Sequence, residues 1–116
     1  MTGGNGRPVF AHAVGVALFD DSGRLLLMQR RDDRTWGLPG GRLEVGESFA
    51  DAVHRECLEK LGHVVELTGL LAVGSNPAHQ PHTYADGETV QFVGVVFRGR
   101  LGSRTQEPDG DSLRIR

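Results

Sequence analysis

Cysteine and long apolar runs are scarce in this chain. Cys57 is the single cysteine, so no disulfide can form within the chain. No apolar run is long enough to cross a bilayer, and residues 1–8 lack the charged-then-apolar layout of a signal peptide. The formal net charge is only −2, so there is no broad positive field to attract a nucleic acid polymer or an anionic membrane. Together these absences favour a protein of the reducing cytoplasm.

The length of the chain indicates a single domain. At 116 residues it lies near the lower end of the common domain size. Residues 1–7 are rich in glycine and polar side chains, and we expect them to form a loose tail. The domain itself is expected to span residues 8–116.

The apolar pattern predicts strands on both sides of one helix. Residues 9–19 and 24–29 are apolar segments joined by a turn sequence, which predicts a β-hairpin. Residues 64–73 and 89–97 predict two more strands, with a long polar loop between them. The chain ends on an alternation typical of a half-buried strand. This order predicts an α/β fold with a mixed sheet.

The helix is expected to begin after a glycine-rich turn. Ser48, followed three residues later by Asp51, has the pattern of a capping box. Gly62 stands where a left-handed residue would end the helix. The apolar stripe between them recurs every four residues and consists of Phe49, Val53, Cys57 and Leu61.

The opposite side of this helix carries carboxylates. Glu56 and Glu59 are three residues apart and therefore share a face. Magnesium is usually held by a few carboxylates together with substrate phosphates. The Gly40 carbonyl could supply a further oxygen, because a glycine turn permits a close approach. Such an ion would neutralise a pyrophosphate and lower the pKa of an attacking water.

The segment from Gly41 to Gly62 resembles the Nudix box of MutT-like hydrolases. The resemblance extends over about residues 10–116 and implies an α/β/α sandwich with a mixed sheet. In that family the chain continues through another short strand and a C-terminal helix, which are missing here. Either the chain is truncated, or a partner subunit in a homodimer covers the face that the helix would cover. The matching positions are Gly41, Glu47, Arg55, Glu56, Glu59 and Gly62.

The resemblance implies a metal-dependent hydrolase in which water cleaves the pyrophosphate of a nucleoside diphosphate linked to another group. Glu56 would bind Mg²⁺ or Mn²⁺ and act as the general base, and Glu59 would be a further ligand. Arg55 would orient these carboxylates by ion pairing. The Gly40 carbonyl completes the expected metal site.

The remaining family positions are expected to shape the motif or to contact the substrate. Gly41, Glu47 and Gly62 would hold the motif together. Arg30 follows the second predicted strand, where the family often places an arginine on the phosphates.

Lys60 departs from the family, which has a second glutamate there as a direct metal ligand. A fixed ammonium roughly 4 Å from a divalent ion would be repelled by about 8 kcal/mol at an effective dielectric constant of about 20. The flexible lysine stem lowers this figure if the charge swings into water. Lys60 can also pair with Glu56, one turn earlier. The alternative function is therefore a Nudix-like nucleotide-binding module with little or no turnover.

Residues outside this segment leave the substrate and one further ligand open. Trp36 is expected to pack beneath the glycine turn rather than stack on a base. From the loop at 75–88, His82 or Tyr84 could stack on a nucleobase. The candidates for an additional acidic ligand are Glu88, Glu107, Asp109 and Asp111.

Overall fold

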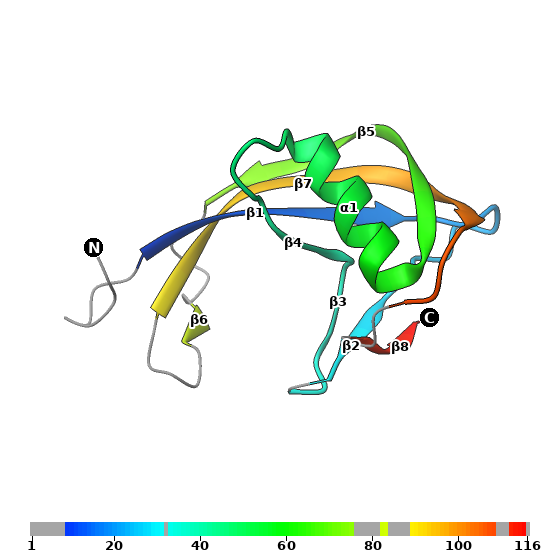
Figure 1. Cartoon of the computed structure of the whole chain (residues 1–116), viewed down its shortest axis with the longest axis horizontal. Coiled ribbons are helices and arrows are strands. Elements are labelled where there is room, and N and C mark those ends of the chain that lie inside the picture. The colour runs from blue at the N-terminus through cyan, green and yellow to red at the C-terminus, as the bar shows by residue number, and fades with distance from the viewer. Residues whose placement is uncertain (1–8, 32, 76–81, 84–88, 109–111, 116) are drawn as a thin grey trace.

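The computed structural model describes residues 9–31, 33–75, 82–83, 89–108 and 112–115. Within these residues the chain forms one helix and eight strands, whose arrangement can be followed in Figure 1. In chain order the elements are β1 (Val9–Leu18), β2 (Met28–Arg30), β3 (Trp36–Gly37), β4 (Gly40–Arg42), α1 (Phe49–Leu61), β5 (His63–Gly74), β6 (His82–Thr83), β7 (Thr89–Arg104) and β8 (Ser112–Ile115).

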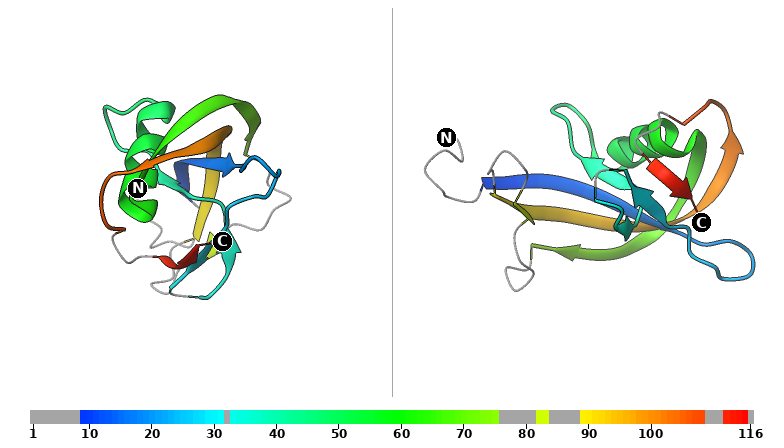
Figure 2. Two further views of the ribbon diagram at one scale, coloured as in Figure 1. Left: turned by 90° about the vertical axis from the view of Figure 1, so that its right-hand side faces the viewer. Right: turned by 90° about the horizontal axis from the view of Figure 1, so that it is seen from below.

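The strands form a larger and a smaller sheet. The larger sheet has the order β4-β1-β7-β5, and β6 also pairs with β7. Strands β1 and β7 run parallel, whereas the other pairs are antiparallel. The smaller sheet has the order β3-β2-β8 and is antiparallel. In Figure 1 α1 lies in front of the larger sheet and crosses β1 and β7, and Figure 2 shows the same arrangement from two further sides. This mixed sheet with a packed helix confirms the predicted α/β class.

The core lies between β1 and α1. Alternation along β1 directs Val14, Val16 and Leu18 toward the helix, and none of them is more than 4% exposed. Val53 and Cys57 meet them from the apolar stripe of α1 and are fully buried. Burying each side chain of this size stabilises the fold by about 1.5–3 kcal/mol. Burial also raises the pKa of the Cys57 thiol to about 12, so Cys57 is the inert core residue that the pattern predicts.

The predicted helix boundaries are confirmed. The Asp51 N–H donates to Ser48 Oγ at 3.0 Å, and the Ser48 N–H donates to Asp51 Oδ2 at 3.2 Å, which together make the capping box. Gly62 adopts a φ of +75° and closes the helix. A Cβ atom at Gly62 would also collide with the backbone carbonyl of Gln106. Both requirements explain the glycine at this position.

The predicted hairpin is wrong in its second half. Of the predicted strand at residues 24–29, only its last two residues belong to a strand, the short β2 (Met28–Arg30). This strand pairs with β3 and β8 rather than with β1. A single bridge, between Phe19 and Leu25, joins the two segments. Strand β1 lies inside the larger sheet, because β7 occupies one edge along its whole length and β4 occupies the other at residues 13–15. That leaves no long free edge for a hairpin partner.

The other strand predictions hold with changed lengths. Strand β5 has a register shift between Leu67 and Gly69, and β7 continues to Arg104. Strand β6 lies inside the segment predicted as a loop, while residues 76–81 and 84–88 are outside the described residues. Strand β8 confirms the C-terminal strand. Within the described part of the chain, no helix has the length and apolar character needed to cross a membrane.

The outer part of β5 exposes apolar side chains to solvent. Leu70, Leu71 and Val73 are 60%, 51% and 70% exposed. Strand β5 is also an edge of the larger sheet. The covering of an apolar face by a partner subunit stays a prediction.

The capping box predicts the effect of removing the Ser48 hydroxyl. The Ser48→Ala substitution should lower the free energy of unfolding by about 1 kcal/mol, because one N–H at the start of α1 loses its acceptor. Urea unfolding followed by circular dichroism measures this change. Ser22→Ala is the matched control, since the contact of Ser22 with Asp20 is made by its backbone N–H. Equal stabilities of the two variants would contradict this account of the helix start.

Candidate metal and phosphate site

The glycine turn is held against the central strand of the larger sheet. Strand β4 pairs with β1 at Gly40 and Gly41, and the Val16 N–H donates to the Pro39 carbonyl at 3.0 Å. A Cβ atom at Gly40 would collide with the backbone of β1, and one at Gly41 would collide with the Glu56 carboxylate. The two glycines therefore let the turn pass between β1 and the carboxylate face of α1, as the sequence predicts.

Arg55 connects the helix to the loop that precedes it. Its Nε donates to Glu47 Oε2 at 2.6 Å, and its Nη2 donates to Glu47 Oε1 at 3.0 Å, so the pair is bidentate. Nη2 also donates to the Arg42 carbonyl at 3.0 Å. Nη1 donates to Glu56 Oε2 at 2.9 Å. Hydrogen bonding to Glu47, followed by the hydrogen bond to Glu56, raises the pKa of the Arg55 guanidinium above its ordinary value.

Both oxygens of the Glu56 carboxylate face a cation. The Glu56 side chain is 10% exposed, and its Oε2 accepts from Arg55. Its Oε1 lies 3.4 Å from Lys60 Nζ. Lys60 Nζ in turn donates to the Gly40 carbonyl at 2.7 Å. The predicted pairing of Lys60 with Glu56 is confirmed, and the ammonium points into the carboxylate cluster rather than into solvent.

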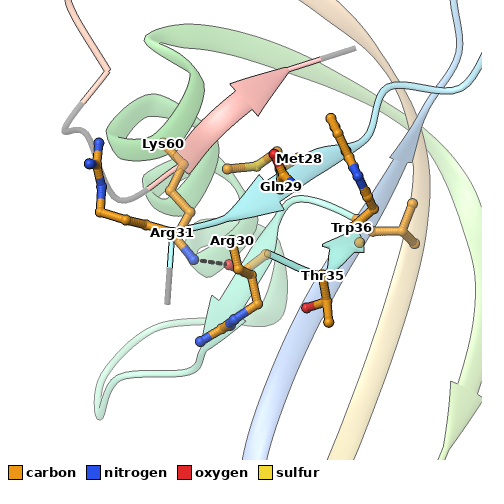
Figure 3. Close-up of a pocket in the computed structure, with 10 residues that line it drawn as sticks. Met28, Gln29, Arg30, Arg31, Thr35, Trp36 and Lys60 are labelled. Carbon is orange, nitrogen blue, oxygen red and sulfur yellow. Dashed lines mark hydrogen bonds between the residues drawn. The ribbon is translucent and has the colours of Figure 1, made fainter. Parts of the chain in front are cut away.

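Two adjoining cavities meet at Lys60. One has a volume of about 620 Å³ and is bordered by Glu56, Glu59 and Arg55. The other has a volume of about 630 Å³ and is bordered by Trp36 and Arg31; Figure 3 shows it. The residues that line both cavities are Arg30, Leu38, Gly40 and Lys60. Lys60 is therefore accessible from both cavities.

The predicted metal ligands lie near one another, but the oxygens they offer are engaged by side-chain cations. Glu59 is the more open carboxylate, with 46% of its side chain exposed and its Oε2 3.6 Å from Arg55 Nη1. The Gly40 carbonyl and Glu56 Oε1 both face the Lys60 ammonium. Within the described ranges, no group of three or more His, Cys, Asp or Glu side chains is arranged to hold a metal ion. In this arrangement the donor set does not fit a divalent cation.

The structure brings Arg30 to the same cavity as Glu56, although on a different element. Arg30 ends β2, and its Nε lies 3.7 Å from Asp33 Oδ1. Trp36 is 39% exposed and borders the second cavity, so it is not packed away beneath the turn. Glu107 pairs with Arg104 at 2.8 Å. His82 lies in β6, but its side chain is not described. The other loop and tail candidates lie outside the described residues: Tyr84, Glu88, Asp109 and Asp111.

The sequence analysis missed Arg42, Glu44 and Phe92 as residues of this site. Glu44 borders the cavity, and its Oε2 lies 3.5 Å from Arg55 Nη1. Phe92 reaches the cavity from β7, and the Arg42 guanidinium carbon lies 5.7 Å from the centre of its ring. Glu44 could have been suspected from its place within the Nudix-like segment. Phe92 could not, because its approach depends on the parallel pairing of β1 with β7.

The pairing of Glu47 with Arg55 predicts a pH dependence of stability. Hydrogen bonding by Arg55, and then by the Glu44 N–H, lowers the pKa of Glu47 below its ordinary value of 4.5. The stabilisation is therefore present above pH 4.5 and is lost as the pH falls through the lower, folded-state pKa. Thermal unfolding between about pH 6 and pH 3 should show a shallower loss for Glu47→Gln than for the wild type. Glu66→Gln, at an exposed position of β5, is the control and should keep the wild-type slope.

Comparison with known proteins identifies the family to which this chain is similar. The NUDIX domain model matches residues 9–115. A Bacillus subtilis (strain 168) protein, named provisionally as an 8-oxo-dGTP diphosphatase, is 35% identical over 105 residues, which cover 80% of this chain and 70% of that protein. A MutT-like protein of Streptomyces ambofaciens is 43% identical over 106 residues, covering 90% of this chain and 62% of that protein.

The same fold is present in a solved structure of comparable similarity. The MutT NUDIX hydrolase from Burkholderia pseudomallei aligns with a TM-score of 0.71 and 30% identity, covering 93% of this chain and 81% of that one. The matched range contains the residues of the glycine turn, Arg55 and the carboxylate face described above. The chain belongs to the NUDIX domain family, whose members include nucleotide diphosphatases.

Proposed function

We propose that this chain hydrolyses the pyrophosphate linkage of a nucleotide, with Glu56 as the group that accepts a proton from the attacking water. The observation that carries the proposal is the arrangement around Arg55. Its guanidinium fixes Glu56 at 2.9 Å while it is itself held by both oxygens of Glu47. A carboxylate fixed in this way at the wall of a cavity is oriented before the substrate arrives.

The substrate phosphates would lie between the cations of the cavity. Arg30 and Lys60 border both cavities, and Arg55 borders the one that contains Glu56. Guanidinium and ammonium groups that border one cavity suit the oxygens of a di- or triphosphate. Phe92 offers an aromatic surface in the same cavity for a neighbouring group of the nucleotide.

Magnesium or manganese is the expected cofactor, as in the family, and would supply positive charge to the phosphates. The residues expected to hold it are Glu56, Glu59 and the Gly40 carbonyl. Because Lys60 faces two of these groups, the ion has no complete site until the ammonium moves.

A second candidate function is favoured by the same contact. If Lys60 stays on Gly40 and Glu56, the chain would bind a nucleotide through its cations but turn it over slowly or not at all. The proton-accepting oxygens of Glu56 would then be occupied by Lys60 and Arg55.

Turnover of a nucleotide panel separates the two functions. Nucleoside triphosphates and nucleoside diphosphate sugars are incubated with the protein and Mg²⁺ or Mn²⁺, and released phosphate or pyrophosphate is measured. The hydrolase predicts metal-dependent release that falls at least about 100-fold in Glu56→Gln, because the general base is removed. Glu66→Gln, on the exposed side of β5, should keep the wild-type rate.

The binding module predicts a different pattern in the same assay. Wild-type protein would bind a nucleotide in calorimetry without releasing product, and Lys60→Glu would gain metal-dependent release. A protein that neither binds nor cleaves any member of the panel would contradict both functions.

A further inference from the structure

The position of the Lys60 ammonium is defined by two oxygens from distant parts of the chain. Nζ lies 2.7 Å from the Gly40 carbonyl on β4 and 3.4 Å from Glu56 Oε1 on α1. A carbonyl and a carboxylate oxygen that converge on one point make a position for a cation. Figure 3 shows the ammonium approaching the turn beside Arg30, with its hydrogen bond to Gly40 drawn as a dashed line.

Burial explains why a cation is needed at this point. Only 10% of the Glu56 side chain and 25% of the Lys60 side chain are exposed. A carboxylate with little access to water is costly unless its oxygens are paired. Arg55 pairs with one oxygen of Glu56, and Lys60 lies beside the other. The ammonium therefore places a positive charge beside Glu56 Oε1, as a bound metal ion would.

A divalent ion and this ammonium cannot share the position. Mg²⁺ binds oxygen at about 2.0–2.1 Å, so an ion on the Gly40 carbonyl and Glu56 Oε1 would occupy the space of Nζ. The ion would have to displace an ammonium that the chain itself tethers one helical turn away. Once displaced, the ammonium would still repel the ion from nearby.

We propose that Lys60 is a tethered cation that occupies the principal metal position of this site and keeps divalent ions from binding to the free protein. The proposal concerns the site of the proposed function, but it is tested without nucleotide and without turnover. A chain that hydrolyses nothing can still satisfy it, and an active enzyme can still contradict it.

Manganese binding to the free protein provides the first test. Free Mn²⁺ is measured by electron paramagnetic resonance during titration of wild type, Lys60→Met and Lys60→Arg. The proposal expects at least tenfold tighter binding to Lys60→Met than to wild type, because the methionine keeps the length of the side chain and removes its charge. Lys60→Arg keeps the charge and should bind as weakly as the wild type.

A distant charge provides the matched control. Arg100→Met removes one positive charge from an exposed position on β7, and it borders neither of the two cavities. It should leave Mn²⁺ binding within twofold of the wild type. Equal Mn²⁺ affinity of wild type and Lys60→Met would overturn the proposal, as would an equal gain in Arg100→Met.

The second test needs no substitution. Lys60 is the single lysine of the chain, so labelling lysine side chains with ¹³C and ¹⁵N gives one set of side-chain signals in nuclear magnetic resonance. The proposal expects the Lys60 signals to stay unchanged as Mg²⁺ is raised to millimolar concentration. A saturable shift at micromolar Mg²⁺ would show that the ion binds beside or in place of the ammonium, and the proposal would be wrong even if Lys60→Met failed to fold.

Discussion

The Arg55 guanidinium is the constraint on which the arrangement of the site depends. It contacts the loop before the helix through Glu47, the glycine turn through the Arg42 carbonyl, and the helix itself through Glu56. Three elements that are separated in the sequence are thereby held at fixed distances. Without this cation, the carboxylates of Glu44, Glu47 and Glu56 would lie near one another unpaired and repel. A lysine could not replace it, because one ammonium cannot bind two oxygens of Glu47 and also reach a carbonyl in a fixed geometry.

Much of the helix and its chemistry could be predicted from the sequence, because both depend on local spacing. Ser48 and Asp51 define the start, Gly62 defines the end, and residues three and four apart define the faces. The proximity of Lys60 to Glu56 follows from the same rule and is confirmed. These features need no knowledge of how the strands pair.

The features that could not be predicted depend on strand order. Residues 24–29 looked like the second strand of a hairpin, but β1 already has β7 and β4 as neighbours. Phe92 enters the site only because β7 lies parallel to β1, a pairing between segments about 80 residues apart in the chain. The hydrogen bond from Lys60 to the Gly40 carbonyl could not be predicted either, because it depends on where the pairing of β4 with β1 places the turn. Local patterns do not contain this information.

The contact between Lys60 and Gly40 links the stability of the site to its chemistry. A buried carboxylate such as Glu56 needs positive charge on both sides. When a metal supplies that charge, the charge can leave, and the empty site carries the cost of the unpaired carboxylate. When Lys60 supplies it, the charge is always present, so the free protein carries no such cost. The same permanence works against hydrolysis, because a carboxylate whose two oxygens both face a side-chain cation leaves no position for a divalent ion. The Lys60 ammonium that neutralises the Glu56 carboxylate in the free protein therefore also limits metal binding and hydrolysis when a nucleotide binds.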